Sequence, residues 1–165
     1  MRYILAAFLC CIVCALRAEP SLTVSSETTN LVLSADDFAA LRHVKIKLRD
    51  PHDKTVHQFT GVAVSEILAR ADAPSGEKLR GHALRLIVIV RARDAYAVSF
   101  SLADFDADYS DRNILLADKE DGAPLSDTAG PLRLIVPGDK KAARWVRMVT
   151  RIEIINSDPK PYRPR

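Results

Sequence analysis

Cysteine is missing from most of this chain. The three cysteines, Cys10, Cys11 and Cys14, all lie within the first 14 of 165 residues. The rest of the sequence therefore supplies no disulfide, no thiolate nucleophile and no thiolate metal ligand. An oxidising compartment permits disulfides without requiring them, so this absence does not argue against export.

Glycine is also scarce, with six residues in the chain, and no phosphate-binding glycine loop is present. No Gly-x-Ser-x-Gly sequence occurs, which excludes the nucleophile elbow of the α/β-hydrolases. Serine, histidine and aspartate are all present, but no arrangement of them singles out a catalytic triad. The residue pattern alone therefore indicates no catalytic group.

Residues 1–18 are predicted to be a secretory signal peptide. Met1–Arg2 gives a positive start, Tyr3–Leu16 is apolar, and Arg17–Pro20 ends the apolar run. About 14 apolar residues are too few to span a bilayer comfortably, whereas signal-peptide cores have this length. We expect a periplasmic or secreted protein that is not inserted in the membrane after cleavage. An uncleaved, tilted signal anchor is the alternative.

The sequence after the leader predicts a single domain over residues 22–156. About 147 residues remain, which is the commonest domain size and enough for one hydrophobic core. Residues 157–165 contain three prolines and are expected to form a flexible tail. Without Arg2 and Arg17, 22 Lys and Arg stand against 21 Asp and Glu, so the pI of 8.8 overstates the basicity.

Charge is distributed unevenly along this domain. Residues 104–127 hold eight acidic residues, and residues 131–165 hold nine cations. This division predicts a surface with an acidic and a basic pole. A basic face suits a periplasmic or membrane protein as partner, and the acidic stretch suits a basic one. No basic helix with base-stacking aromatics is present, so we expect no nucleic-acid binding.

Hydrophobic periodicity predicts many strands and few helices. Val44–Arg49 alternates apolar and cationic residues, and Val56–Phe59 is its expected hairpin partner. Leu84–Val90 is the most hydrophobic run after the leader, and from Leu86 to Val90 both faces are apolar, which is typical of a central buried strand. Further strands are expected at Leu22–Val24, Leu31–Leu33, Tyr96–Phe100, Ile114–Ala117, Leu132–Val136 and Met148–Ile155. The predicted fold class is α+β, not a repeated βαβ unit.

Helices are expected at three places. Val64–Ala71 has apolar residues at i, i+3, i+4 and i+7. Ser34 and Ser101 are each followed three residues later by an aspartate, which is a variant of the capping box that begins a helix. The helices that follow these two serines are expected to be short.

Two clusters of potential metal ligands can be weighed from their spacing. His52 and His57, with Asp50 and Asp53, have an H-x4-H spacing that matches no helical face, so we interpret them as a solvated hairpin loop. We expect no metal site there.

The acidic stretch Asp104–Asp111 imitates the start of a calcium loop. Tyr109 stands where such a loop needs glycine, and Leu115 stands where it needs a bidentate glutamate. The EF-hand interpretation therefore fails. A solvated acidic loop is the simpler interpretation, and a casual surface calcium site stays open.

The cations after Pro137–Gly138 are the most suggestive local feature. Lys140, Lys141 and Arg144 follow this turn and precede Trp145. Exposed amides with Lys and Arg suit an oxyanion or a phosphate. The alternative is a surface turn in which Trp145 anchors the last strand to the core.

A family resemblance emerges from an ordered series of motifs. The motifs are Phe59–Val62, Ile67–Ala71, Asp94–Tyr96, Asp121–Leu125, Gly130–Pro137, Arg144–Val146 and Ile152–Ile154. In this order, over roughly Leu22 to Ile155, the chain resembles the molybdopterin-binding oxidoreductase domain of the sulfite oxidase type. The resemblance implies a compact α+β domain of mixed β-sheets with short helices.

The chain departs from that family at its metal ligand. In the family a cysteine thiolate upstream of the Gly-Val motif ligates molybdenum, and here the matching region, Val44–Phe59, has no cysteine. Ala95 replaces the glycine of the family's Asp-Gly-Tyr motif, and the longer N-terminal part of the larger members is missing. Lys140, Lys141 and Arg144 resemble the loop that grips the pterin phosphate, so the resemblance implies cofactor or anion binding there.

We therefore expect the family scaffold without its reaction. The expected protein is a non-redox ligand-binding or protein-interaction module with no catalytic residue, no metal and no cofactor, although the resemblance leaves open molybdopterin or another anionic small molecule. The alternative is a molybdopterin-dependent oxidoreductase that holds molybdenum through an Asp or Ser oxygen. A third hypothesis is an exported accessory protein that contacts a membrane sensor or enzyme through its basic face.

Overall fold

The protein has a strand-rich α+β fold, obtained as a computed structural model that describes residues 22–157. Its strands are β1 (Leu22–Ser25), β2 (Asn30–Leu33), β3 (His43–Arg49), β4 (Val56–Ala63), β5 (Leu86–Ala92), β6 (Ala97–Ser101), β7 (Leu115–Glu120), β8 (Ala123–Pro124), β9 (Arg133–Ile135) and β10 (Val149–Asn156). Its helical segments are α1 (Ala35–Ala39), α2 (Val64–Arg70), and the 3-10 turns η1 (Gly76–Lys78), η2 (Gly81–Arg85), η3 (Leu102–Phe105) and η4 (Ala142–Arg144). The predicted α+β class, with mixed sheets and short helices, is confirmed.

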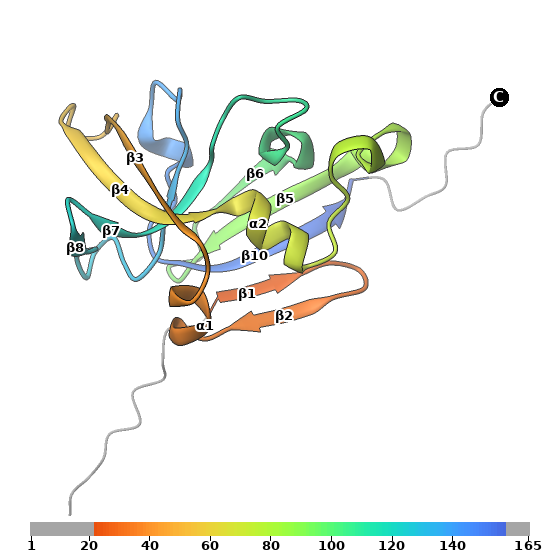
Figure 1. Cartoon of the computed structure of the whole chain (residues 1–165), viewed down its shortest axis with the longest axis horizontal. Coiled ribbons are helices and arrows are strands. Elements are labelled where there is room, and N and C mark those ends of the chain that lie inside the picture. Colours follow the sequence, from red (N-terminus) through yellow and green to blue (C-terminus); the bar gives the residue numbers. More distant parts are fainter. Residues whose placement is uncertain (1–21, 158–165) are drawn as a thin grey trace, which may run out of the picture.

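The first sheet, sheet A, has the strand order β2-β1-β10-β5-β6. Strand β1 runs parallel to β10, and the other neighbours are antiparallel. Figure 1 shows how this brings the first described strands beside the last one. Val88 and Val90 of β5 are fully buried, whereas Ile87 and Ile89 are half-buried. The expectation that this strand is buried on both faces is wrong for the outer face, because the core covers only the inner one.

The second sheet, sheet B, has the order β3-β4-β7-β8, and β9 also pairs with β7. The β3–β4 hairpin is confirmed, with Ile46 opposite Phe59, and the lysines of β3 face solvent at the sheet edge. Gly61 lies at an irregularity in the β4–β7 pairing. A Cβ atom at Gly61 would lie 2.1 Å from the carbonyl oxygen of Leu116. Only glycine therefore allows β4 and β7 to approach this closely.

Both serine caps are present where the sequence places them. The Ser34 hydroxyl accepts the Asp37 backbone N–H at 3.1 Å, and the Asp37 carboxylate accepts the Ser34 backbone N–H at 3.0 Å. Ser101 and Asp104 form the equivalent capping box at the start of η3. Each reciprocal pair satisfies backbone donors that a helix start leaves free. In α2 the three apolar positions Val64, Ile67 and Leu68 are buried, as their spacing predicts.

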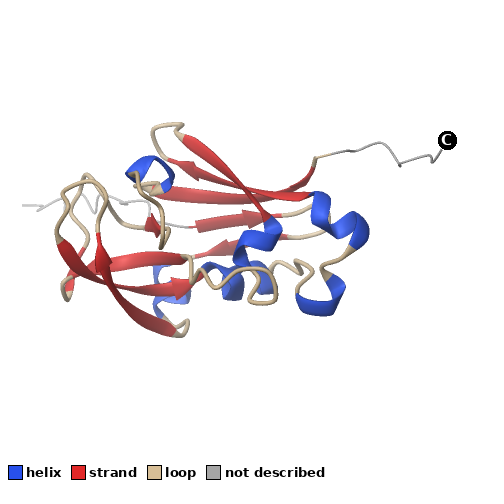
Figure 2. Ribbon diagram, turned by 90° about the horizontal axis from the view of Figure 1, so that it is seen from above, coloured by secondary structure: helices blue, strands red, loops and turns tan. Residues whose placement is uncertain are grey.

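The hydrophobic core takes side chains from both sheets. Figure 2 shows the sheets as separate groups of strands, with most helical segments at the opposite end from the β3–β4 hairpin. Phe59 of sheet B meets Trp145 edge-to-face, with ring centroids 5.8 Å apart. The indole N–H of Trp145 donates to the Val136 carbonyl at 3.0 Å. Trp145 is 4% exposed and so fixes the segment before β10 against the core.

Two segments predicted from the sequence lie outside the described residues. These are the signal peptide, residues 1–18, and nearly all of the tail at 157–165. Within residues 22–157, every helix is too short or too polar to cross a lipid bilayer.

Candidate functional site

A pocket of about 530 Å³ opens where the β3–β4 hairpin, the β5–β6 turn and the segment before β10 come together. We call it the Arg133 pocket. Its lining includes the side chains of Asp50, Asp53, Asp94, Tyr96, Glu120, Arg133 and Trp145. They belong to segments that are far apart in the sequence, so the pocket is a product of the fold rather than of one loop.

A buried ion pair forms the wall of this pocket. Arg133 is 6% exposed and Asp50 is 2% exposed, and Nη2 of Arg133 lies 2.6 Å from Oδ2 of Asp50. The guanidinium carbon lies 5.5 Å from the ring centroid of Phe59 and 5.3 Å from that of Trp145. Nη1 is 3.8 Å from Oε2 of Glu120, and the buried Nε has no hydrogen-bond partner. Asp50 is therefore the main compensation for this buried charge.

The hairpin turn holds Asp50 in place. Its Oδ1 accepts the backbone N–H of His52 at 2.7 Å, and its own backbone N–H donates to the Thr55 carbonyl at 2.8 Å. The interpretation of this loop as solvated is therefore wrong for Asp50. Asp50 can be buried because each of its carboxylate oxygens accepts a hydrogen bond, one from the His52 backbone and one from Arg133.

A second group of charged side chains, the His57 cluster, lies beside the pocket. It consists of His57, Asp53, Glu120 and Asp121. Nδ1 of His57 is 2.6 Å from Oδ2 of Asp121 and 3.3 Å from Oε1 of Glu120, and Nε2 is 2.9 Å from Oδ2 of Asp53. The hydrogen bonds to Asp121 and then to Asp53 raise the pKa of His57 to about 9. The imidazole is therefore cationic at neutral pH and balances part of the surrounding acid.

This raised pKa predicts how stability depends on pH in metal-free protein. A folded pKa near 9 against an unfolded value near 6.5 gives a stabilisation that is complete below pH 6.5. It is lost as the pH rises through 9. We expect it to be about 1 kcal/mol, because Asp53 and Asp121 are about half exposed and solvent screens them. Urea denaturation of the wild type and of His57→Gln, with chelator present, measures it.

The expected result is a stability gap between the two proteins at pH 6 that narrows by pH 9.5. His82 is exposed and serves as the matched control, so His82→Gln should follow the wild-type profile. A gap that stays constant from pH 6 to pH 9.5 would show that the His57 charge does not contribute.

The predicted anion loop is only partly available to a ligand. The Arg144 guanidinium donates from Nε to the Asp139 carboxylate at 2.8 Å and lies 5.0 Å from the Phe100 ring centroid. This pairing raises the pKa of Arg144. Lys140 and Lys141 are exposed. The structure thus commits Arg144 to Asp139, and anion binding by the two lysines stays a prediction.

The Asp94–Tyr96 motif forms the turn that borders the pocket. The Tyr96 hydroxyl donates to the Ala143 carbonyl at 2.6 Å, and the Tyr96 backbone N–H donates to Oδ1 of Asp94 at 3.0 Å. Ala95 has a φ of 71°, in the left-handed region that glycine adopts more readily. The alanine therefore keeps the turn conformation that a glycine at this position favours.

Sequence reasoning set aside Asp50, Asp53 and His57 as a solvated loop, and it missed Arg133, Glu120 and Asp121 as site residues. One signal for Arg133 was available, because it is the only charged residue within the apolar run Leu132–Val136. A charge in a buried strand requires a partner. Nothing in the local sequence identifies that partner as Asp50, which lies 83 residues away.

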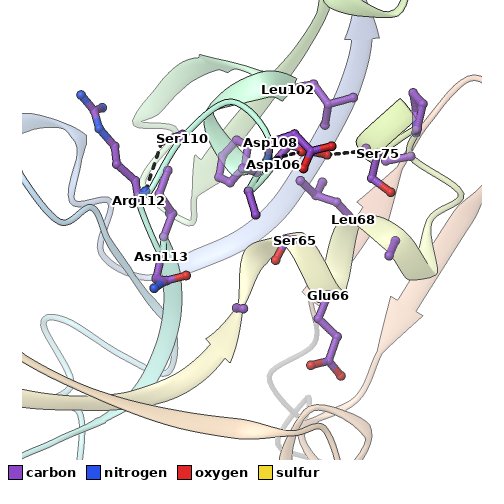
Figure 3. A pocket seen from close by; sticks show the side chains of 18 of the residues that line it. Ser65, Glu66, Leu68, Ser75, Leu102, Asp106, Asp108, Ser110, Arg112 and Asn113 are labelled. Atoms are coloured by element: carbon purple, nitrogen blue, oxygen red, sulfur yellow. Dashed lines mark hydrogen bonds between the residues drawn. The ribbon is translucent and has the colours of Figure 1, made fainter. Parts of the chain in front are cut away.

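A second pocket, of about 540 Å³, lies between α2, the loop after it and residues 102–114. In Figure 3, Asp106 and Asp108 lie next to Ser75, whereas the Glu66 side chain on α2 points away from them. Asp106 is 9% exposed, and its carboxylate accepts the backbone N–H groups of Gly76 at 2.7 Å and Asp108 at 2.9 Å. The interpretation of this acidic stretch as a solvated loop is therefore wrong at Asp106, which ties two loops together.

The sequence that forms the Arg133 pocket matches a known protein family. No curated protein matches the sequence. A family model described as the oxidoreductase molybdopterin binding domain matches residues 49–162, more than half of the chain. This match contains Asp50, Asp94, Tyr96, Arg133 and Trp145, which all line the Arg133 pocket. The chain therefore belongs to the oxidoreductase molybdopterin-binding domain family.

Proposed function

We propose that this protein is an exported, non-redox binding module built on a sulfite oxidase type of molybdopterin-binding domain. The observation that carries the proposal is the donor set of the Arg133 pocket. The pocket is lined by Asp94, Tyr96, Arg133 and Trp145 from the motifs that carry the resemblance, and no thiol is present among residues 22–157. A scaffold can persist while its site chemistry changes, because function resides in the site and not in the fold.

The donors of this pocket do not fit a thiolate-bound molybdenum centre. Three of its oxygen donors are also engaged, since Asp50 holds Arg133, and Asp53 and Glu120 face His57. Oxygen ligation of molybdenum by any of these three, under the alternative hypothesis, would have to break its contact.

A protein partner is favoured by the position of the two lysines in the predicted anion loop. Lys140 and Lys141 are exposed and stand beside Asp139, whose carboxylate is neutralised by Arg144. An exposed pair of cations attracts an acidic surface and mainly accelerates its association. We propose that this basic loop contacts a periplasmic or membrane protein, and that the Arg133 pocket holds the small molecule if one is bound.

The test uses native material purified from the exported fraction of a cofactor-producing bacterium. Fluorescence of released pterin and mass spectrometry of the denatured supernatant report a bound small molecule, and affinity capture reports a protein partner. A pterin without molybdenum supports a ligand-binding module. A stoichiometric partner without pterin supports the interaction role. Redox turnover of sulfite-type substrates by the purified protein would overturn the proposal.

A charge reversal localises the partner surface. The double variant Lys140→Glu with Lys141→Glu leaves the Arg144–Asp139 pair intact and should lower capture of the partner. Lys45→Glu with Lys47→Glu makes the same charge change on the exposed edge of β3 and is the matched control. Equal capture by both double variants would show that the basic loop is not the contact.

A further inference from the structure

Three carboxylates converge on the imidazole of His57 at the hairpin end of sheet B. His57 comes from β4, Asp53 from the hairpin turn, Glu120 from the end of β7 and Asp121 from the turn after it. Nδ1 of His57 and one oxygen each of Glu120 and Asp121 all lie within 4.8 Å of one another. One nitrogen donor and two carboxylate oxygens are thus gathered on the same side of the imidazole.

Hydrogen bonds to the backbone of Gln58 hold the Asp121 carboxylate in position. Asp121 has a φ of 50°, and its backbone N–H donates to the Gln58 carbonyl at 2.8 Å. Oδ1 of Asp121 accepts the Gln58 backbone N–H, also at 2.8 Å. The second oxygen, Oδ2, is left facing Nδ1 of His57. The carboxylate is therefore held in place before any ligand arrives.

The opposite ring nitrogen has its own partner. Nε2 of His57 lies 2.9 Å from Oδ2 of Asp53. A carboxylate that accepts the N–H of one ring nitrogen fixes the tautomer and leaves the other nitrogen free to bind a metal. Metal-bound histidines commonly have this arrangement. Asp53 is thus placed as a positioning residue behind the imidazole rather than as a direct ligand.

The His57 cluster carries an excess of negative charge that a bound cation would reduce. Three carboxylates surround one imidazole, and the nearest guanidinium, that of Arg133, lies 3.8 Å from Glu120 and is already held by Asp50. Lys47 contributes a more distant positive charge near Asp121. Even with the imidazole protonated, the carboxylates outnumber the cations that touch them. A divalent ion would replace the imidazole proton and reduce this excess.

We propose that His57, Glu120 and Asp121 bind one divalent transition-metal ion, with Zn²⁺ the best match, and that Asp53 orients His57 for it. A mixed imidazole and carboxylate set suits Zn²⁺, whereas Mg²⁺ and Ca²⁺ prefer oxygen ligands alone. Glu120 and Asp53 also line the Arg133 pocket, and their side chains are 26% and 45% exposed. The ion therefore reaches its ligands from the pocket, and water or a small anion completes its coordination from that side.

The experiment is a metal titration of chelator-treated protein by calorimetry, with Zn²⁺ and Mg²⁺ in separate runs. We expect one Zn²⁺ per chain and much weaker binding of Mg²⁺. Asp121→Asn and Glu120→Gln should each weaken Zn²⁺ binding by more than about 100-fold, and Asp53→Asn by about 10- to 100-fold. Glu27→Gln removes an exposed carboxylate elsewhere and should leave the affinity unchanged.

Circular dichroism of each variant shows that the fold is intact, and Co²⁺ substitution adds a visible absorption spectrum that Asp121→Asn should abolish. Failure of the wild type to bind Zn²⁺ would overturn the proposal, and so would equal affinity in Asp121→Asn and the Glu27→Gln control. In either case the four side chains form a hydrogen-bonded ion cluster only. The proposal is independent of the non-redox function, because Zn²⁺ can bind whether or not a pterin is present.

Discussion

Asp50→Asn is expected to lower the free energy of unfolding by about 3–5 kcal/mol, because it leaves the buried guanidinium of Arg133 without its counter-charge. Asparagine has nearly the same shape, so the loss comes from charge and not from a cavity. The pair is almost fully removed from water, with 2% of Asp50 and 6% of Arg133 exposed. Guanidinium chloride denaturation followed by circular dichroism measures the change.

Two further variants separate the ion pair from the packing around it. Arg133→Met removes the buried charge, and the double variant with Asp50→Asn should lose about 2 kcal/mol less than the two single losses added together. Arg112→Met removes a 43% exposed guanidinium that lies 3.9 Å from Asp139, a carboxylate that Arg144 still holds, and should cost less than about 1 kcal/mol. Additive losses in the double variant would mean that Asp50 and Arg133 stabilise the fold separately.

Gly61→Ala is expected to have a similarly large effect, for a steric reason. The new Cβ would lie 2.1 Å from the Leu116 carbonyl oxygen and 2.5 Å from the Cα of Ala117. Both neighbours are backbone atoms of a paired strand, so neither yields without separating β4 from β7. We expect a loss of about 3 kcal/mol or more, at or above the usual range for overpacking. Thermal unfolding by calorimetry checks the prediction.

Gly81→Ala is the matched control for Gly61. Gly81 has a φ of 57°, but no heavy atom lies within 4 Å of the position of its added Cβ. Alanine there bears only the left-handed backbone cost, about 1 kcal/mol. If Gly61→Ala is no more destabilising than Gly81→Ala, the close approach of the two strands is not what requires glycine.

Local sequence predicts the elements whose causes are local. The Ser34 and Ser101 caps are set within three residues, and the period of two in Val44–Arg49 predicts a half-exposed strand. The partial exposure of the outer face of β5 could not be predicted from local sequence. The apolar run Leu86–Val90 indicates burial on both faces, but whether another layer covers the outer face depends on the whole chain.

The site was harder to predict because its contacts are long-range. Asp50 and Arg133 are 83 residues apart, and His57 and Asp121 are 64 apart. Both contacts depend on how β4 and β9 pair with β7, which no local pattern specifies. Proximity in sequence groups Arg144 with the two lysines, but in the structure Arg144 pairs with Asp139, five residues before it.

The family resemblance identified the correct scaffold from motifs that are individually weak. In the structure, four residues from these motifs line one pocket: Asp94, Tyr96, Arg133 and Trp145. The same pocket explains why the missing thiol matters. The charged side chains there pair with one another, and the two most buried, Asp50 and Arg133, stabilise the fold through their ion pair.

The most direct test of the non-redox proposal is the molybdenum content of the native protein, measured by elemental mass spectrometry after gentle purification. We expect no molybdenum above the level of the buffer, even in cells that load molybdenum enzymes. One tightly held molybdenum atom per chain would contradict it.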